Sequence, residues 1–285
     1  MSSTSVLSPA KINLFLKVLR KRDDGFHELY SLMQPVTLYD NISIDAQEGE
    51  GISLECHHAE LPADHTNLAW RAARLLLDTT GIKKRITITI DKKIPVGAGL
   101  GGGSSNAAAV LMALNDLLNA GLTEGKLMEM GALLGSDVPF FILGGPALAT
   151  GRGEVLSRVA LPGCHYILIN PGISVSTAWV YGNLNLTKNP EDNNLSYSGE
   201  ALRSCADVAA LLANDLEPVT TGRFPEISRL KALLVEHGAL GALMSGSGAT
   251  VFGLFSTHAA ARGALEGIRP LLDEEASIFL VHGVE

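Results

Sequence analysis

Pro95-Val-Gly-Ala-Gly-Leu-Gly-Gly-Gly-Ser-Ser-Asn106 is the stretch that decides how this chain folds. It places five glycines between positions 97 and 103. Before it, the alternating run Arg85-Ile-Thr-Ile-Thr-Ile-Asp91 predicts a β-strand. After it, apolar residues at helical spacing predict a helix from Ala107 to Asn119. The sequence therefore predicts a strand, a glycine loop and a helix N-terminus in direct succession.

This succession suits an anionic ligand. Glycines let the backbone approach a phosphate group and direct its N–H groups at it. The first turn of the following helix adds unpaired N–H groups and the positive end of the helix dipole. Each charge-assisted hydrogen bond is worth about 1.5–3 kcal/mol, so several together could hold a triphosphate. A flexible linker is disfavoured, because linkers mix glycine with serine and charge and are not set between a strand and an alanine-rich helix.

Other glycine motifs fit less well. A Walker A loop needs Gly-Lys followed by Ser or Thr, and the only Gly-Lys pair, at Gly125-Lys126, lacks this. Gly97, Gly99 and Gly102 satisfy Gly-x-Gly-x-x-Gly, but a dinucleotide-binding unit needs a buried apolar strand and a later acidic residue. Here the strand alternates Ile with Thr, as in a half-covered antiparallel sheet. The His-Arg-Asp and Asp-Phe-Gly motifs of protein kinases are absent.

Three motifs together resemble the GHMP small-molecule kinases. They are Ser8-Pro-Ala-Lys-Ile-Asn-Leu14, the glycine stretch itself, and Ser245-Gly-Ser-Gly-Ala-Thr-Val-Phe252. Two further runs, Asp24-Gly-Phe-His27 and Gly135-Ser-Asp-Val-Pro-Phe140, resemble the branch of that superfamily that acts on a cytidine diphosphate sugar alcohol. The matches extend over nearly the whole chain and occur in the family's order.

The resemblance implies an α+β, two-domain GHMP kinase fold. We expect an N-terminal, ATP-binding, ribosomal-protein-S5-like α/β domain over residues 1–158 and a C-terminal ferredoxin-like α+β domain over residues 159–285, with the active site between them. The pattern of strands and helices after residue 165 independently favours the ferredoxin-like arrangement. Residues 30–57 predict a run of short strands, and residues 185–199 a long surface loop rather than a mobile flap.

The resemblance also implies a reaction, which is ATP-dependent phosphorylation of the substrate's 2-hydroxyl in the non-mevalonate (methylerythritol phosphate) isoprenoid pathway. Asp137 is expected to be the general base, with Lys11 beside it. A lysine there would keep the carboxylate ionised and neutralise charge on the transferred group. The simpler alternatives are a solvated sheet face for Lys11 and Asn13, which lie two residues apart, and a helix N-cap for Asp137.

ATP binding is assigned by the resemblance to the loop and to three residues before it. The loop residues are Pro95, Val96, Gly97, Ala98, Gly99, Leu100, Gly101, Gly102, Gly103, Ser104 and Ser105. Asn67, Leu68 and Lys92 are expected near the adenine. Magnesium should bridge the phosphates, with Ser104 or Ser105 as the nearest protein group and no carboxylate ligand identified. The motif at 245–248 is expected to support the loop, although Ser-Gly-Ser-Gly is also typical of a hairpin.

Substrate binding is assigned by the resemblance to Asn13, Phe26, His27, Thr177 and Tyr181. Phe26 and Tyr181 are expected to stack on the two faces of the cytosine, and His27 to hydrogen-bond its edge. A stacking ring is worth about 1–3 kcal/mol per base. The family commonly has tyrosine where this chain has Phe26, so stacking is kept and a hydroxyl contact is lost.

Composition limits the remaining possibilities. The 285 residues are 46% hydrophobic and 18% charged, which suits a sizeable core, and no apolar run is long enough for a membrane span. The net charge of −8 disfavours nucleic acid, and the acidic surplus lies after residue 93. Cys56, Cys164 and Cys205 form no Cys-x-x-Cys pair, which favours reduced thiols in a cytoplasmic protein. We expect a small-molecule substrate, no membrane partner, and a monomer or weak homodimer.

Three alternative functions stay open at this point. A GHMP kinase for another small alcohol, of the homoserine or mevalonate type, is disfavoured only by the substrate residues Phe26, His27, Thr177 and Tyr181. An NAD-binding oxidoreductase is disfavoured by the alternating strand and the missing acidic partner. A nucleotide sensor without catalysis is disfavoured because both Lys11 and Asp137 are present.

Overall fold

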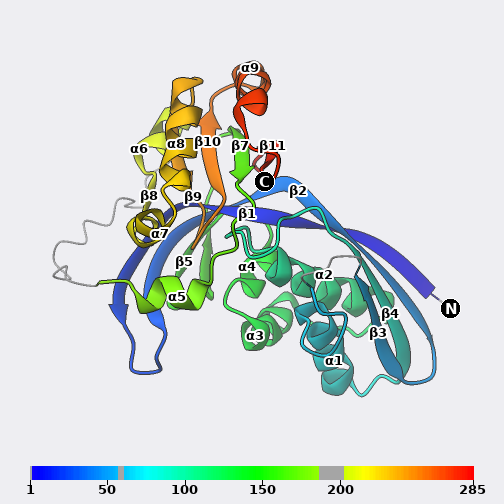
Figure 1. Cartoon of the computed structure of the whole chain (residues 1–285). Coiled ribbons are helices and arrows are strands. Elements are labelled where there is room, and N and C mark those ends of the chain that lie inside the picture. Colours follow the sequence, from blue (N-terminus) through cyan, green and yellow to red (C-terminus); the bar gives the residue numbers. More distant parts are fainter. Residues whose placement is uncertain (1, 57–60, 186–201) are drawn as a thin grey trace. The chain divides into compact units, whose positions relative to one another are not determined.

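The chain begins with two long strands, β1 (Ser2–Lys21) and β2 (His27–Glu48), each of which runs through both of the units into which the structure divides (Figure 1). The computed structural model describes residues 2–56, 61–185 and 202–285. The first unit consists of residues 1–10, 38–96 and 101–144, and the second of residues 11–37, 97–100 and 145–285. The domain boundary near residue 158 stays a prediction.

The expected run of short strands over residues 30–57 is wrong in one respect. Strand β2 continues without a break to Glu48, and only β3 (Gly51–Cys56) is short. The reason lies in the side-chain alternation, which continues from Val36 to Ala46 and buries every second residue along that part of the strand.

In the first unit, a sheet carries four helices. Residues 41–48 of β2 pair antiparallel with β4 (Lys84–Asp91), and β3 pairs parallel with β4. Ile86, Ile88 and Ile90 of β4 are buried, whereas Thr87 and Thr89 are only partly covered, which confirms the half-covered sheet. The helices are α1 (Leu68–Thr80), α2 (Gly102–Leu117), α3 (Glu124–Leu134) and α4 (Val138–Leu143).

The helix starts of the first unit follow their capping residues. Helix α1 begins after Asn67, whose side chain accepts a hydrogen bond from Ala69 N, and α3 begins after Thr123, whose hydroxyl accepts from Lys126 N. Helix α2 begins at Gly102, five residues before the predicted start at Ala107. The last two glycines of the loop are therefore themselves helical.

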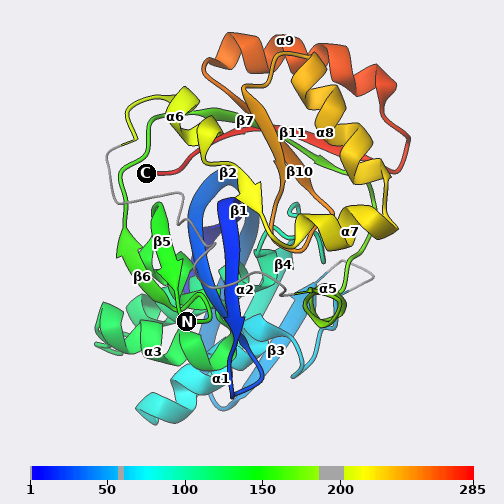
Figure 2. The ribbon, with the colours of Figure 1, turned by 90° about the vertical axis from the view of Figure 1, so that its left-hand side faces the viewer.

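The second unit contains a four-stranded antiparallel sheet with the order β11-β7-β10-β9. The strands are β7 (His165–Asn170), β9 (Gly241–Met244), β10 (Val251–Phe255) and β11 (Ser277–His282). Helices α8 (Glu226–Glu236) and α9 (His258–Ile268) pack against this sheet through a shared apolar core (Figure 2). This order and connectivity confirm the ferredoxin-like arrangement.

The remaining elements of the second unit are short. A hairpin is formed by β5 (Ala147–Thr150) and β6 (Val155–Arg158), and β5 also pairs with β2. Strand β8 (Ala213–Asn214), which pairs parallel with β1, was not predicted. The other elements are α5 (Thr177–Gly182), α6 (Cys205–Ala210), α7 (Glu217–Arg223) and a 3-10 turn at Arg269–Leu271. The predicted surface loop lies, from residue 186 onward, outside the described residues.

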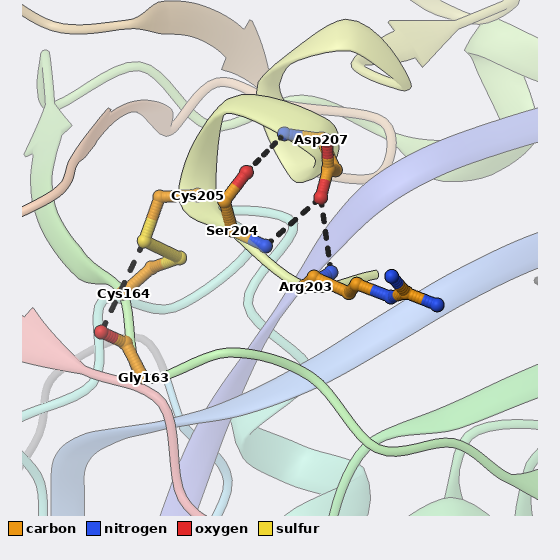
Figure 3. Close-up of a disulfide and its surroundings, with 6 residues drawn as sticks. All are labelled: Gly163, Cys164, Arg203, Ser204, Cys205 and Asp207. Atoms are coloured by element: carbon orange, nitrogen blue, oxygen red, sulfur yellow. Dashed lines mark hydrogen bonds between the residues drawn. A yellow bond between two sulfur atoms is a disulfide. The ribbon is translucent and has the colours of Figure 1, made fainter. Parts of the chain in front are cut away.

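A disulfide joins Cys164 to Cys205, the first residue of α6 (Figure 3). The two residues are 41 positions apart in the sequence, and their Cα atoms are 5.8 Å apart. The expectation of reduced thiols is therefore wrong for this pair, because the fold brings together cysteines that show no local spacing. Cys56 keeps its thiol. Within the described ranges, none of the helices combines the length and the apolar character that crossing a membrane requires.

Candidate active site

The second half of the glycine loop forms the N-terminus of helix α2. Gly101 precedes the helix with a φ of 69°, in the left-handed region that favours glycine, and no side chain caps the helix. Gly103, in the first turn, is exposed. The N-cap residue of this 16-residue helix thus offers no side-chain acceptor to the first N–H groups, an arrangement that suits phosphate oxygens.

The first half of the loop, residues 97–100, packs against the third motif within the second unit. The hydroxyl of Ser245 donates to Gly99 O at 3.0 Å, and Thr250 N donates to Ala98 O at 3.3 Å. A Cβ atom on Gly99 would lie 2.1 Å from Ser245 O, so only glycine fits at this position. The expected packing of residues 245–248 against the glycine loop is thus present, and phosphate binding by that loop stays a prediction.

Lys11 and Asn13 lie on the same face of β1 and are both buried, with 5% and 2% of their surface exposed. Lys11 Nζ donates to Asn13 Oδ1 at 2.6 Å, and Asn13 Nδ2 donates to the hydroxyl of Ser31 at 2.9 Å. That hydroxyl donates its single hydrogen to Phe15 O at 2.7 Å, so it can only accept from Asn13. The amide oxygen of Asn13 is thereby directed at Lys11. The solvated-face alternative for Lys11 is wrong.

The two candidate serines of the loop differ in their surroundings. Ser105 is buried, and its hydroxyl accepts a hydrogen bond from Ser8 at 2.7 Å. Ser104 is partly exposed, and its Oγ lies 3.7 Å from the position that a Cβ of Gly135 would take. Ser104 is therefore the better placed of the two to meet a phosphate or its metal ion, and it lies beside the turn that leads to Asp137.

Asp137 immediately precedes α4, but its side chain accepts no capping hydrogen bond from that helix. The structure therefore gives no support to the simpler role of an N-cap. Asp137 belongs to the first unit and Lys11 to the second, and their pairing in catalysis stays a prediction.

The residues expected near adenine surround the start of α2. If Gly103 carried a Cβ atom, that atom would lie 3.7 Å from Leu68 Cδ1. A Cβ atom on Gly102 would lie 3.0 Å from Lys92 Nζ. Asn67 is used structurally, because its Oδ1 caps α1 and its Nδ2 donates to Pro62 O at 3.0 Å. The structure thus brings Leu68 and Lys92 to the phosphate loop and places Asn67 next to them in the chain.

The residues expected to bind the substrate make three separate contacts within the second unit. The rings of His27 and Tyr181 are stacked, with centroids 4.8 Å apart and planes inclined by 24°. Thr177 shares a 2.8 Å hydrogen bond with Ser247 of the third motif. Phe26 is 51% exposed, and the guanidinium of Arg152 lies 4.9 Å from its ring centroid. Arg152 is a neighbour that sequence reasoning did not identify.

Burial lowers the pKa of His27 below its ordinary value of 6.5, and the charge of Lys21 lowers it further. The imidazole is therefore neutral at pH 7, with one ring nitrogen as donor and the other as acceptor. A neutral ring of this kind suits the edge of an uncharged base.

Among the described residues, no group of three or more His, Cys, Asp or Glu side chains is arranged to hold a metal ion. Magnesium sites in kinases use substrate phosphates with one or two protein carboxylates, so a site of that kind does not require such a group.

Fold and motifs define a GHMP kinase, and the comparisons agree. The model of the GHMP kinases N terminal domain matches residues 67–145, and that of the GHMP kinases C terminal domain matches residues 193–270. A 4-diphosphocytidyl-2-C-methyl-D-erythritol kinase from Citrifermentans bemidjiense is 53% identical over 268 residues, which cover 93% of this chain and 94% of the relative. The chain therefore belongs to the 4-diphosphocytidyl-2-C-methyl-D-erythritol kinase family, whose members are ATP-dependent phosphotransferases.

Solved structures support the same fold. A crystal structure of 4-(cytidine 5'-diphospho)-2C-methyl-D-erythritol kinase superposes with a TM-score of 0.80 at 35% identity, covering 99% of this chain and all of that one. Homoserine kinase from Cytophaga hutchinsonii also has a TM-score of 0.80, at 20% identity, over 100% of this chain and 96% of that one. The second likeness shows the fold alone, so shape does not separate the two substrates.

Proposed function

We propose that this chain transfers the γ-phosphoryl group of ATP to the 2-hydroxyl of 4-diphosphocytidyl-2-C-methyl-D-erythritol, in the non-mevalonate isoprenoid pathway. The observation that carries the proposal is the 53% identity to a kinase named for this substrate, combined with a glycine loop that leads into an uncapped helix N-terminus. The same family membership removes the NAD-binding alternative.

Asp137 acts as the general base in this proposal. The carboxylate accepts the proton of the substrate hydroxyl. At the same time, the hydroxyl oxygen attacks the γ-phosphorus in line with the leaving oxygen. Lys11 supplies positive charge that favours the ionised carboxylate and the developing charge on the phosphoryl group. The chain of hydrogen bonds from Ser31 through Asn13 fixes the position of the Lys11 ammonium group.

The loop from Pro95 to Ser105 holds the ATP phosphates through its backbone N–H groups. Bound magnesium would supply positive charge that offsets part of the phosphate charge, and the hydroxyl of Ser104 is the protein group proposed to face it. Leu68 and Lys92 adjoin the loop, as neighbours of the adenine would. Asn67 contributes there by capping helix α1.

The acceptor substrate is recognised by five residues, which are Asn13, Phe26, His27, Thr177 and Tyr181. The neutral imidazole of His27 hydrogen-bonds the edge of the cytosine, and its stack on Tyr181 holds the ring in place. Phe26 offers an exposed aromatic face for stacking on the base. Asn13 and Thr177 contact the rest of the substrate in this proposal.

We also propose a cytoplasmic location and a monomer or weak homodimer, with no nucleic-acid or membrane partner. The need for ATP favours the cytoplasm. The Cys164–Cys205 disulfide is of a kind that is rare there, so its redox state in protein taken from cells is a direct check of the location.

ATP consumption measured with three acceptors tests the proposal. The acceptors are 4-diphosphocytidyl-2-C-methyl-D-erythritol, the same compound without its cytidylyl group, and homoserine, each with ATP and Mg²⁺. Asp137→Asn is assayed beside the unchanged protein. We expect turnover of the first acceptor alone, and its loss in the variant.

Two results would redirect the proposal. Turnover that does not require the cytidylyl group would assign the chain to another small alcohol and would remove the roles of Phe26, His27 and Tyr181. Turnover that survives in Asp137→Asn would remove Asp137 as the base while leaving the substrate assignment intact.

A further inference from the structure

Asp40, on strand β2 in the first unit, is a carboxylate with 0% of its surface exposed. Its Oδ1 accepts hydrogen bonds from the backbone N–H groups of Lys93 and Ile94, at 2.8 and 2.9 Å. Its Oδ2 accepts from Lys92 Nζ and, at 2.9 Å, from Asn106 Nδ2. A buried charge is tolerated only when it is paired and fully hydrogen-bonded, and four donors meet that condition.

The donors to Asp40 lie on both sides of the glycine loop. Lys92, Lys93 and Ile94 directly precede the loop, and Asn106 lies in the first turns of α2, just after it. One carboxylate therefore fixes the distance between the segment that enters the loop and the helix that leaves it. The Lys92 ammonium also lies close to the first residue of the helix, 3.0 Å from the position that a Cβ of Gly102 would take.

Asn106 extends this connection. Its amide group donates both to Asp40 and, at 3.0 Å, to the hydroxyl of Ser8, which in turn donates to Ser105. Asn106 is 3% exposed, so its two hydrogens have no water to replace these acceptors. The side chains of both residues at the end of the loop, Ser105 and Asn106, are thus held in buried hydrogen bonds.

We propose that Asp40 is a positioning residue for the ATP phosphates, acting through the backbone of residues 93–94 and through Asn106. The inference rests on the proposed function, because it takes the glycine loop as the phosphate site. Asp40 does not touch the nucleotide. It holds the segment that enters the loop, residues 92–94, in a fixed position against the first turns of α2, whose N–H groups meet the anion.

Charge and geometry predict opposite effects for Asp40→Asn, which makes the test decisive. Removing a negative charge near a bound triphosphate would strengthen ATP binding if electrostatics alone mattered. Removing the acceptor that organises the loop would instead weaken ATP binding. The asparagine has nearly the same shape, but its Nδ2 donates where the carboxylate accepted, so two of the existing donors are left facing another donor.

The experiment is isothermal titration of the full chain with ATP and Mg²⁺, and separately with adenosine, without any acceptor substrate. For Asp40→Asn we expect the Kd for ATP to rise about tenfold or more, the loss of roughly one charge-assisted hydrogen bond, with the Kd for adenosine changed less than twofold. Asp45→Asn is the matched control, because it removes the same charge from the same strand on the half-exposed face. It should leave both constants unchanged.

Unchanged or tighter ATP binding by folded Asp40→Asn would overturn the proposal. An equal loss of affinity for adenosine would also overturn the proposal, because the substitution would then act through Lys92 on the adenine site.

If Asp40→Asn does not fold, Asn106→Ala takes its place, since it keeps the Asp40–Lys92 pair. That variant should weaken ATP severalfold but not adenosine, and unchanged ATP binding would again overturn the proposal. Failure of the unchanged protein to bind ATP would instead contradict the proposed function.

Discussion

Replacing Gly99 by alanine is expected to destabilise the second unit and to disturb the phosphate loop. Gly99 has a φ of +77°, and a Cβ there would lie 2.1 Å from Ser245 O and 3.1 Å from Gly248 N, both of them backbone atoms that a side-chain rotation cannot move. An alanine in the left-handed region costs about 1–2 kcal/mol, and forcing an extra carbon into a packed site costs about 1–3 kcal/mol. Together they predict a loss of about 2–5 kcal/mol in the free energy of unfolding.

Thermal unfolding followed by circular dichroism measures this loss. For a unit of this size, each kcal/mol lowers the melting temperature by about 2–4 °C, so a fall of roughly 4–20 °C is expected. Gly125→Ala is the control, because no atom lies within 4 Å of its Cβ position and it sits in helix α3. It should not lower the melting temperature. If Gly99→Ala has the same melting temperature as the unchanged protein, the packing of the third motif on the loop does not constrain this position. The steric argument would then be wrong.

Three further predictions concern catalysis, pH and the disulfide. Asp137→Asn should lower kcat by about 10²–10⁴-fold with ATP affinity nearly unchanged, as rapid-quench assays and titration would show, and a comparable kcat would contradict its role as the base. Burial, followed by the charges of two neighbouring histidines, lowers the pKa of His165 below its ordinary 6.5, so folding stability should fall as the pH drops through about 6.5. The slope of urea midpoints against pH should flatten in His165→Gln, and an unchanged slope would exclude this group. Peptide mapping without reductant should join Cys164 to Cys205 but not to Cys56, and reduction should cost about 4 kcal/mol for a loop of this length. Melting that is insensitive to reductant would contradict this last expectation.

Much of the local structure could be predicted because it depends on neighbours in the sequence. The alternation of Ile and Thr predicted β4, and the helical spacing of apolar residues after the glycine loop predicted α2. The strand–helix pattern after residue 165 was enough for the ferredoxin-like sheet, because that topology is set by the order of its elements. The start of helix α2 was predicted too late, because glycine has a low helix propensity. Gly102 and Gly103 are nevertheless helical, since packing and loop geometry decide the conformation of this first turn.

The contacts that organise the site could not be predicted, because they join residues that are distant in the chain. Ser31 hydrogen-bonds Asn13 from a neighbouring strand, and Asp40 reaches Asn106 across 66 positions. A serine or aspartate inside an alternating strand carries no signal that distinguishes a buried partner from a solvated face. The family motifs point to Lys11 and the glycine loop, whereas only the fold reveals the side chains of Asn13 and Ser245 that contact them.

The interleaving of the two units has a consequence for how the chain is made. Val18 N and the ammonium of Lys17, on β1, hydrogen-bond the carboxylate of Asp215, 197 and 198 positions later. On a ribosome, which adds roughly 5–20 residues each second, the N-terminal strand of the second unit must wait many seconds for its partner to emerge. A nascent chain therefore carries Lys17 and Val18 without their partner Asp215 for most of its synthesis. Strand β1 is thus among the first segments translated, yet its contacts within the second unit are completed only near the end.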